Sequence, residues 1–228
     1  MQDFIGKVTK KEYITDDVII LSMTRPADFE FKAGQFVTIK MQKDDIKRMK
    51  SYSILSNPSK KDELNFCIKI IPDGFASGIF EKTEVGNEFP VKGPFGHFTF
   101  KEDADVKEHF LIGTGTGLAP IYSMVKEYAK KMPHKKFTIL VGYRYIRNVT
   151  FDKELRKMEE ECPNFTYKVS ITREPWDRLN GRVYEHLPKD VSNKKFYICG
   201  LKEMVIDTRD KLYAAGVSKE NVVFERYS

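Results

Sequence analysis

A glycine-rich segment, Ile112–Pro120, carries the sharpest chemical signal in the sequence. It follows a short apolar run, so it falls where a buried strand would end and a helix would begin. Glycines at such a turn let the backbone approach a pyrophosphate, and the amino terminus of the helix offers free N–H groups. Gly113 and Gly115 fit the dinucleotide fingerprint, but Leu118 occupies the place of its third glycine. The segment alone therefore indicates either a phosphate-binding loop or a tight turn.

A second group of residues with binding chemistry lies in the first half of the chain. Lys50, Tyr52 and Ser53 place a cation, an aromatic ring and a hydroxyl close together, which suits a strand that clamps a phosphate and covers a flat ring. Gly74 and Ser77 precede a short helical piece and predict a second phosphate contact. Each piece taken alone is more typical of an ordinary strand or turn.

The spacing of cysteines and histidines argues against a metal centre. No two cysteines form a CxxC pair, which excludes a four-thiolate zinc or iron–sulfur site inside the chain. No two histidines are three or four residues apart, so we expect no metal site. The cysteines are Cys67, Cys162 and Cys199, and the histidines are His97, His109, His134 and His186.

The charge balance is mildly basic, with 39 Lys and Arg against 33 Asp and Glu, a net charge of +6. The charged clusters do not favour nucleic acid, because Lys60–Glu63 carries both signs and Glu159–Glu161 is wholly acidic, as in solvated faces. We therefore expect no nucleic-acid partner. A basic surface suits an acidic protein or a phosphorylated cofactor equally well.

A length of 228 residues predicts one or two domains. The longest uncharged stretch, Phe110–Val125, is interrupted by glycines and a proline, whereas a membrane span needs about 20 mostly apolar residues. The amino terminus does not resemble a secretory signal. We expect a soluble, cytoplasmic protein without membrane association.

Before residue 105 the chain consists of short β-rich runs separated by turn residues. Six runs at this spacing, with one helical piece near Ser77–Lys82, predict an antiparallel β-barrel over residues 1–102. The runs are Phe4–Tyr13, Val18–Met23, Gly34–Met41, Tyr52–Leu55, Leu64–Ile71 and Glu88–Val91.

After residue 105, apolar runs alternate with segments of helical spacing. The helical spacing is clearest over Ile121–Tyr128 and Met204–Leu212, with Gly216 as a stop signal. Five strands separated by helices predict a parallel sheet in an α/β nucleotide-binding domain over residues 103–228. The strand runs are His109–Ile112, Phe137–Val141, Phe165–Ile171, Phe196–Cys199 and Val222–Phe224.

Taken together and in this order, the motifs resemble those of the ferredoxin–NADP reductase family of flavoproteins. The resemblance covers nearly the whole chain, and the agreement of seven motifs in one order argues against coincidence. The motifs are Ala33–Phe36, Tyr52–Ser53, Gly74–Ser77, Gly93–Gly96, Gly113–Pro120, Cys199–Gly200 and Glu225–Tyr227.

The resemblance implies that the barrel binds a flavin. Tyr52 would lie against one face of the isoalloxazine ring, and Ser53 would hydrogen-bond near its N5 atom. Lys50 stands where the family usually has an arginine on the flavin phosphate, and lysine keeps the charge but loses the bidentate fork. This departure leaves both FAD and FMN open, while the phosphate motif with Gly74 and Ser77 and the norm of the family favour FAD.

The resemblance also implies that the second domain binds a nicotinamide dinucleotide. Cys199, with Gly200, would lie beside the nicotinamide ring, at the end of the fourth strand, where open α/β sheets bind ligands. A buried cysteine is otherwise usually a small hydrophobic residue. Glu225 and Tyr227 match the terminal acid and the ring-covering aromatic residue of the family, although Ser228 makes Tyr227 penultimate. The implied pyrophosphate contacts are Gly113, Thr114, Gly115, Thr116 and Gly117, and the implied catalytic residues are Ser53, Cys199 and Glu225.

Three arginines bear on the choice between NADPH and NADH. Arg144, Arg173 and Arg182 follow successive elements of the predicted sheet, and no acid follows the second strand, where NAD-selective sites often place one. In similar bacterial members, arginines at such positions hold the 2′-phosphate. The alternative is that they are surface residues paired with Glu174 or Asp177.

The implied activity is hydride transfer from NAD(P)H, with NADPH favoured over NADH, to FAD and then electron transfer to a separate acceptor protein. Ferredoxin or flavodoxin, both typically acidic, would suit the basic charge balance. The alternatives are a reductase component of an oxygenase or a free-flavin reductase and, from another class, a non-catalytic electron-relay subunit of a larger complex. The sequence leaves the oligomeric state open, and a monomer agrees with it.

Overall fold

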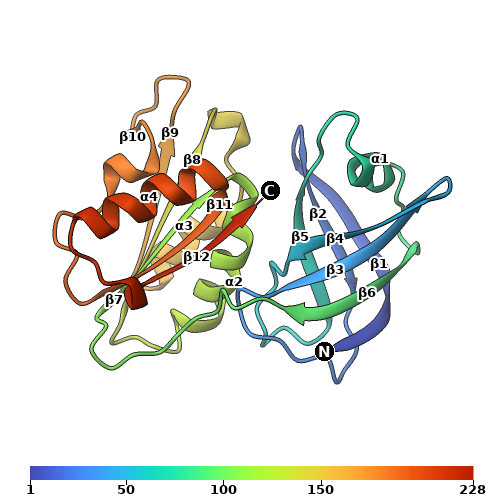
Figure 1. The fold of residues 1–228 in the computed structure, drawn as a ribbon, viewed down its shortest axis with the longest axis horizontal. Coiled ribbons are helices and arrows are strands. Elements are labelled where there is room, and N and C mark those ends of the chain that lie inside the picture. Colours follow the sequence, from blue (N-terminus) through green and yellow to red (C-terminus); the bar gives the residue numbers. More distant parts are fainter. Residues whose placement is uncertain (228) are drawn as a thin grey trace.

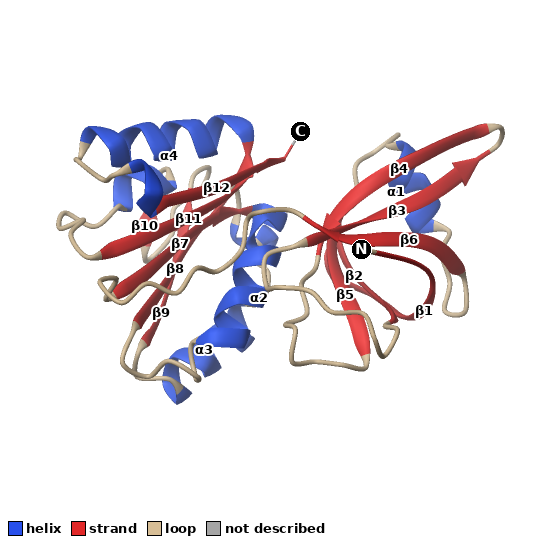
Figure 2. Ribbon diagram, turned by 60° about the horizontal axis from the view of Figure 1, so that its bottom comes forward, coloured by secondary structure: helices blue, strands red, loops and turns tan. Residues whose placement is uncertain are grey.

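Two six-stranded sheets, one antiparallel and one parallel, form the framework of the molecule (Figure 1). The computed structural model describes residues 1–227. The antiparallel sheet comes first in the chain, and the parallel sheet with its helices follows, so the predicted fold class is confirmed. The two sheets lie side by side, and the last strand ends between them (Figures 1 and 2).

The antiparallel strands are arranged in the order β4-β3-β6-β1-β2-β5. An isolated bridge between Ile54 and Phe66 joins the two ends of this order, which closes the sheet into a barrel. Apolar side chains fill its interior, and the short helix α1 (Phe75–Glu81) adds Phe80 to that core. The strands are β1 (Gln2–Thr15), β2 (Val18–Thr24), β3 (Phe36–Lys43), β4 (Ile46–Ser53), β5 (Glu63–Lys69) and β6 (Glu88–Phe95).

The second sheet is wholly parallel, in the order β10-β9-β8-β7-β11-β12. Its central strands are mainly apolar because helices cover both faces, with α2 and α3 on one face and α4 on the other (Figure 2). The strands are β7 (Glu108–Thr114), β8 (Lys136–Tyr143), β9 (Phe165–Ile171), β10 (Leu179–Asn180), β11 (Lys194–Leu201) and β12 (Val222–Tyr227). The helices are α2 (Leu118–Tyr128), α3 (Asp152–Glu161) and α4 (Lys202–Ala214). No helix within residues 1–227 has the length and apolar character needed to cross a membrane.

Three elements differ from the sequence prediction. Strand β4 begins at Ile46, well before Tyr52, but its residues 46–51 are all exposed and give no alternating pattern. The acidic run Glu159–Glu161 is the last turn of helix α3, an element that the sequence did not predict. The two-residue strand β10 makes six parallel strands instead of five, so Cys199 lies in the fifth of them, and that strand continues to Leu201.

The segment between β6 and β7 is fixed to the parallel sheet. The Nζ atom of Lys135 donates hydrogen bonds to the backbone carbonyls of Asp103 (3.0 Å) and Ala104 (3.1 Å). The backbone N–H of Lys101 donates to the hydroxyl of Tyr197 at 3.1 Å. This connection is therefore a packed part of the structure rather than a free linker.

Helix α2 makes the apolar contact between the two sheets. Ala119 of this helix packs in one cluster with Leu55 and Cys67 of the barrel, and Tyr122 lies against the same cluster. Gly34 comes so close that a Cβ atom there would lie 2.4 Å from the Cε atom of Met124. The contact places the carboxyl end of β4 near the carboxyl ends of the parallel strands.

Candidate active site between the two sheets

The predicted catalytic residues meet where the barrel faces the carboxyl edge of the parallel sheet. The hydroxyls of Ser53, at the end of β4, and Tyr227, at the end of β12, are 2.9 Å apart and hydrogen-bonded. Strand β11 lies between β7 and β12, and its register sets Cys199 beside Gly113 on one side and Glu225 on the other. Residues from four distant parts of the sequence therefore converge on one place. Ser228, which follows Tyr227, lies outside the described residues.

The electrostatics of this place favour neutral groups. Burial raises the pKa of Glu225 to about 7, and a hydrogen bond with Ser53 opposes the rise. Burial also raises the pKa of the Cys199 thiol well above its usual range, and the nearby Glu225 carboxyl adds to this effect. The thiol is therefore protonated and is not a nucleophile. The Glu225 carboxyl, in contrast, can hold or release a proton near neutral pH.

The glycine-rich turn has the features that a pyrophosphate requires. Gly115 has a φ of +53°, which favours glycine, and a Cβ atom there would meet nothing within 4 Å, so space is open in front of it. The Oγ1 atom of Thr114 is buried and has no hydrogen-bond partner in the described part of the chain. It lies against Gly200, where a Cβ atom would come within 2.4 Å of it. An open space beside an unpaired buried hydroxyl fits a ligand rich in acceptor oxygens.

Gly117 allows helix α2 to begin close to the backbone of Cys199. A Cβ atom on Gly117 would lie 2.3 Å from the carbonyl oxygen of Cys199, so no larger residue fits without a shift. The turn Gly115–Gly117, which includes Thr116, leads directly into Leu118 at the first position of the helix. The sequence prediction of a strand, a glycine turn and a helix is thus matched by the structure.

On the barrel side, Tyr52 offers a half-buried ring next to α1. The ring lies edge-on to Phe80, with centroids 5.4 Å apart, and burial raises the pKa of its hydroxyl. Lys50, two residues earlier on the same face of β4, is exposed. The Oγ atom of Ser77, a buried residue, accepts a hydrogen bond from the backbone N–H of Ile71 at 2.9 Å, so the side chain stabilises the turn.

Gly74 closes the same turn and leaves no room for a side chain. A Cβ atom there would lie 2.9 Å from both the carbonyl oxygen of Ile71 and the Oγ atom of Ser77. The predicted phosphate motif is therefore a tight, internally bonded turn at the start of α1.

Arg48 is a candidate site residue that the sequence interpretation missed. Its guanidinium lies 4.8 Å from the ring centroid of Phe75, the first residue of α1. It shares a face of β4 with Lys50 and Tyr52, because side chains alternate along a strand. The alternation of Arg48, Lys50 and Tyr52 could have revealed it, had the strand been predicted to start before Tyr52.

The structure groups the three arginines at one edge of the parallel sheet. Arg144, Arg173 and Arg182 follow β8, β9 and β10, which are neighbours in the sheet, and all three are exposed. The backbone N–H of Arg173 donates to the carbonyl of Arg144 at 2.9 Å. The alternative interpretation was that these arginines pair with Glu174 or Asp177. Within residues 1–227 no salt bridge joins them to either acid. Glu174 instead accepts a hydrogen bond from the backbone N–H of Ile146.

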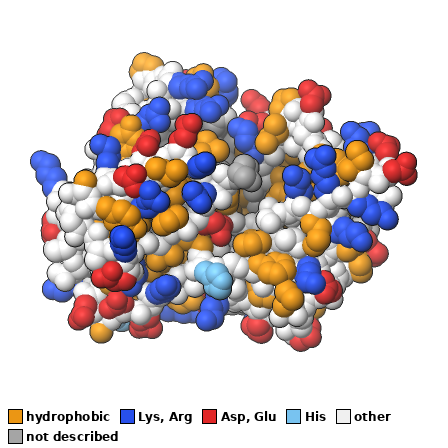
Figure 3. All heavy atoms as spheres, in the orientation of Figure 1, with side chains coloured by type: hydrophobic (Ala, Val, Ile, Leu, Met, Phe, Trp, Pro, Cys, Tyr) orange, Lys and Arg blue, Asp and Glu red, His pale blue; other side chains and the backbone are white. Residues whose placement is uncertain are grey.

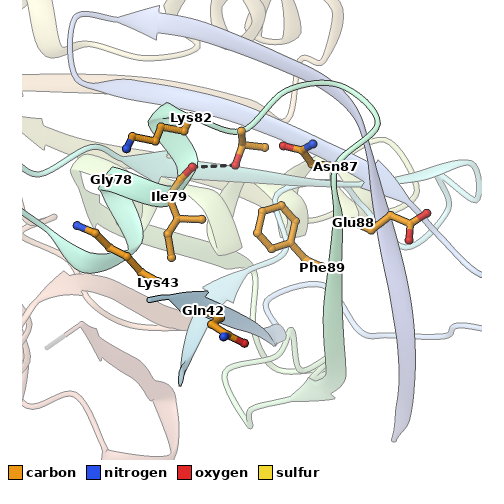
Figure 4. Close-up of a pocket in the computed structure, with 9 residues that line it drawn as sticks. Gln42, Lys43, Gly78, Ile79, Lys82, Asn87, Glu88 and Phe89 are labelled. Atoms are coloured by element: carbon orange, nitrogen blue, oxygen red, sulfur yellow. Dashed lines mark hydrogen bonds between the residues drawn. The ribbon is translucent and has the colours of Figure 1, made fainter. Parts of the chain in front are cut away.

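The surface has two hollows, one away from the candidate site and one that borders it at Glu225. One, of about 410 Å³, lies beside α1 and is lined by Lys43, Lys82 and Phe89 among others (Figure 4). The other, of about 360 Å³, runs beside Glu225 and is lined by His97 and Phe224 among others. No three His, Cys, Asp or Glu side chains come together as a metal site in the part of the chain that the structure describes.

A β-barrel followed by a parallel sheet with a glycine-rich turn is the arrangement of a two-domain oxidoreductase of the flavin and nicotinamide class. Residues 6–100 match the family described as oxidoreductase FAD-binding domain, and residues 111–210 match the family described as oxidoreductase NAD-binding domain. The chain belongs to the ferredoxin–NADP reductase family of flavoproteins.

Named relatives and solved structures agree with this assignment. The chain is 26% identical over its whole length to the reductase component of propane 2-monooxygenase from Rhodococcus jostii, covering 64% of that protein. It is 30% identical over 77% of its length to a glycine betaine monooxygenase reductase subunit from Pseudomonas aeruginosa, covering 50% of it. The chain thus spans about half to two thirds of the curated relatives it matches.

The fold is shared with a ferredoxin NADP+ reductase from Neisseria gonorrhoeae, solved with bound FAD and NADP. The TM-score is 0.90 at 22% identity, and the match covers 99% of both chains. A cytochrome P450 reductase from Amycolatopsis gives a TM-score of 0.91 at 22% identity, with 99% of this chain and 69% of that chain covered. At these identities the likeness describes the fold.

Proposed function

We propose that this protein takes a hydride from NAD(P)H, with NADPH preferred, onto bound FAD and delivers electrons to a separate acceptor protein. The observation that carries the proposal is the convergence of Ser53, Cys199, Glu225 and Tyr227 beside the glycine-rich turn. The flavin, when bound, supplies the conversion between two-electron and one-electron chemistry. The residues of the chain supply binding, orientation and exclusion of water.

The barrel would hold the flavin through a ring contact and two cations. Tyr52 would cover one face of the flavin, and Ser53 would hydrogen-bond at the reactive edge. Arg48 and Lys50, exposed on the same face of β4, would bind the phosphates, and Arg48 restores a guanidinium near the place where the family has one. The internally bonded turn at the start of α1 supports a second phosphate contact and thereby FAD over FMN.

The parallel sheet would hold the dinucleotide at its carboxyl edge. The open space at Gly115 and the unpaired hydroxyl of Thr114 support a pyrophosphate there. Arg144, Arg173 and Arg182, which form no ion pair with Glu174 or Asp177 among the described residues, support a bound 2′-phosphate and hence NADPH.

Glu225 and Cys199 would contribute to hydride transfer in different ways. The Glu225 carboxyl, with its pKa raised to about 7 by burial, would hold a proton beside the reacting rings. Cys199 is neutral and fully buried, so it would shape the surface against which the nicotinamide packs.

The acceptor would be an acidic protein such as ferredoxin or flavodoxin. Three exposed cations on the β3–β4 hairpin that the flavin would leave free support this choice, against two acids at its tip. These cations are Lys40, Lys43 and Lys47, while Arg48 and Lys50 of the same hairpin would bind the flavin phosphates. Lys and Arg side chains lie on both halves of the surface, the barrel half included (Figure 3). The names of the relatives favour one specific variant of this function, in which the acceptor is the oxygenase component that the reductase serves. We place the border between the flavin domain, residues 1–102, and the nucleotide domain, residues 103–228, inside the fixed connection.

Anaerobic mixing of the FAD-loaded protein with NADPH tests the proposal. We expect about one FAD per chain and bleaching of the flavin absorbance, faster with NADPH than with NADH. A protein that cannot be reconstituted with FAD or FMN contradicts the flavin assignment. If the protein binds FAD but neither NADPH nor NADH bleaches the flavin absorbance, the protein is an electron-relay subunit instead.

A further inference from the structure

One stripe of helix α2 follows the barrel segment that continues strand β4. Ala119, Ser123 and Glu127 are spaced by four residues, so they project from one side of the helix. Ala119 packs in the apolar cluster with Leu55. The Oγ atom of Ser123 donates a hydrogen bond of 2.8 Å to the backbone carbonyl of Ser56. The helix and the segment therefore contact each other at successive positions.

Glu127 completes this stripe as a carboxylate held by the barrel. Its Oε2 atom accepts hydrogen bonds from Asn57 Nδ2 (2.9 Å) and from the backbone N–H of Ser59 (3.0 Å). Its Oε1 atom accepts from the Ser59 hydroxyl at 2.7 Å. Lys131, one turn further along, pairs with the same carboxylate, and its Nζ atom donates to Ser59 Oγ at 2.9 Å. We call these four residues the Glu127 cluster.

Within the cluster Glu127 is buried, with only 8% of the residue exposed, whereas Ser59 and Lys131 are exposed. Burial raises the pKa of Glu127, but hydrogen bonds from Lys131, Asn57 and Ser59 outweigh it and lower the pKa to about 2. The carboxylate is therefore charged at any pH near neutrality. Hydrogen bonds to a charged acceptor are about twice as strong as those between neutral groups.

This cluster contributes a carboxylate that stays charged near neutral pH to the contact between the two sheets. Within residues 1–227, no salt bridge joins residues 1–95 to residues 108–227. The other side-chain hydrogen bonds between these two ranges join Ser53 to Tyr227, Ser53 to Glu225 and Ser123 to Ser56. Among their groups only the Glu225 carboxyl can carry a charge, and burial raises its pKa to about 7. Loss of the Glu127 carboxylate would leave the contact without its strongest polar component.

Both partners of the cluster continue directly into the candidate active site. On the barrel side, the chain runs from Tyr52 and Ser53 to Ser59 within seven residues. On the other side, α2 begins directly after Gly117, whose backbone lies against Cys199. Because a helix transmits displacement along its axis, a shift at its end moves the glycine turn against the flavin strand.

We propose that the Glu127 cluster sets the distance and angle between the flavin-binding strand and the nicotinamide-binding turn. Glu127 is thus a positioning residue for hydride transfer, although it lies outside the reacting groups. The inference rests on the proposed function. A misplacement of about 1 Å between reacting groups can lower a rate on the order of a hundredfold, so a contact of this kind has kinetic consequences.

Replacement Glu127→Gln tests the inference, because one of its two acceptor oxygens becomes an NH₂ group facing donors. We expect the limiting rate of anaerobic flavin reduction at saturating NADPH to fall about tenfold or more. The flavin absorbance spectrum, the affinity for FAD and the affinity for adenosine 2′-phosphate should stay at wild-type values. Amide hydrogen exchange at Ser59 should become faster, which reports directly that the contact is lost.

Two further variants separate positioning from general stability. Glu161→Gln removes an exposed ion pair between Lys130 and Glu161 inside the second domain and should leave the limiting rate unchanged. Ser59→Ala removes one donor and should slow reduction less than Glu127→Gln. The double variant should be no slower than Glu127→Gln alone, because both changes break the same contact.

The outcomes distinguish this inference from the proposed function. If wild-type protein is reduced but Glu127→Gln keeps the wild-type limiting rate while Ser59 exchanges faster, the positioning role is wrong. If Glu127→Gln does not fold with FAD, Ser59→Ala decides, and an unchanged rate in that variant overturns the inference. If neither NADPH nor NADH reduces the wild type, the proposed function fails, and this inference fails with it.

Discussion

Cys199 is a candidate site residue because of its place rather than its reactivity. Burial keeps its thiol protonated, and the strand register sets it between Gly113 and Glu225. Its place follows from the order of strands and from the motif Cys199–Gly200, so the sequence could predict it. Arg48 and Glu127 could not be predicted in this way. Glu127, for example, meets a residue 68 positions away, and local sequence patterns do not record such pairings.

At the same scale, Arg173 offers the clearest test of nucleotide choice. Arg173→Ala should lower kcat/KM with NADPH about ten- to a hundredfold, because a charge-assisted hydrogen bond to phosphate is worth roughly 1.5–3 kcal/mol. Efficiency with NADH, which lacks that phosphate, should hardly change. Arg178→Ala is a matched control, since Arg178 lies over the ring of Trp176 instead of at a strand end. An equal loss with both nucleotides would show that Arg173 does not bind the 2′-phosphate.

At the scale of elements, the junction of β7, the glycine turn and α2 depends on one absent side chain. Gly117 has helical backbone angles, which alanine also adopts, so the backbone conformation does not disfavour alanine there. The obstacle is steric, because the added Cβ atom would lie 2.3 Å from the Cys199 carbonyl oxygen. Gly117→Ala should lower the free energy of unfolding by about 1–3 kcal/mol, measured by urea denaturation of the FAD-loaded protein. Gly78→Ala in α1 is the control: its nearest neighbour is Lys43 Nζ at 3.9 Å, and it should raise stability by up to about 1 kcal/mol. Equal effects of the two changes would contradict the steric argument.

Burial also explains which elements could be predicted. The central parallel strands are enclosed by helices and appear in the sequence as apolar runs, as Phe137–Val141 does within β8. Strand β9, next to the edge strand, has its predicted bounds Phe165–Ile171 and alternates buried and exposed residues in its first half. The first part of β4 is exposed on all its residues, and α3 buries only Leu155 and Met158. The first part of β4 and helix α3 therefore lack a clear hydrophobic pattern in the sequence, and contacts with neighbouring elements stabilise them. The missed start of β4 is also the reason that Arg48 was missed.

At the scale of the whole molecule, His109 makes stability depend on pH. It is fully buried, and neither ring nitrogen has a hydrogen-bond partner within the described residues. Burial, helped by the charges of Lys135 and Lys195, lowers its pKa from 6.5 to about 4. The unfolded chain therefore takes up the proton first, and stability falls as the pH drops from about 6.5 to 4, by about 3 kcal/mol in all. Glu225, with its raised pKa, acts in the opposite direction, because its contribution is present at low pH and is lost as the pH rises through about 7.

Comparison with His109→Phe isolates the histidine contribution. Urea midpoints at pH 7.5 and pH 5 should differ by an amount equivalent to about 2 kcal/mol more in the wild type than in the variant. Phenylalanine suits the position because His109 stacks with Phe137 and lies near Phe100. If the two proteins lose the same stability between these pH values, His109 is not the group that titrates.

The fixed connection between β6 and β7 also determines where a protease cleaves the molecule first. Cleavage needs a segment that opens locally, and here opening would first require Lys135 to leave two backbone carbonyls and Tyr197 to leave a backbone N–H. The hairpin tip at Asp44, exposed and in the left-handed region at a φ of 53°, offers a far easier first cut. Limited digestion should therefore cleave the β3–β4 hairpin of the barrel before it cleaves the connection between β6 and β7. The two domains should thus stay joined in one fragment during the early part of the digestion.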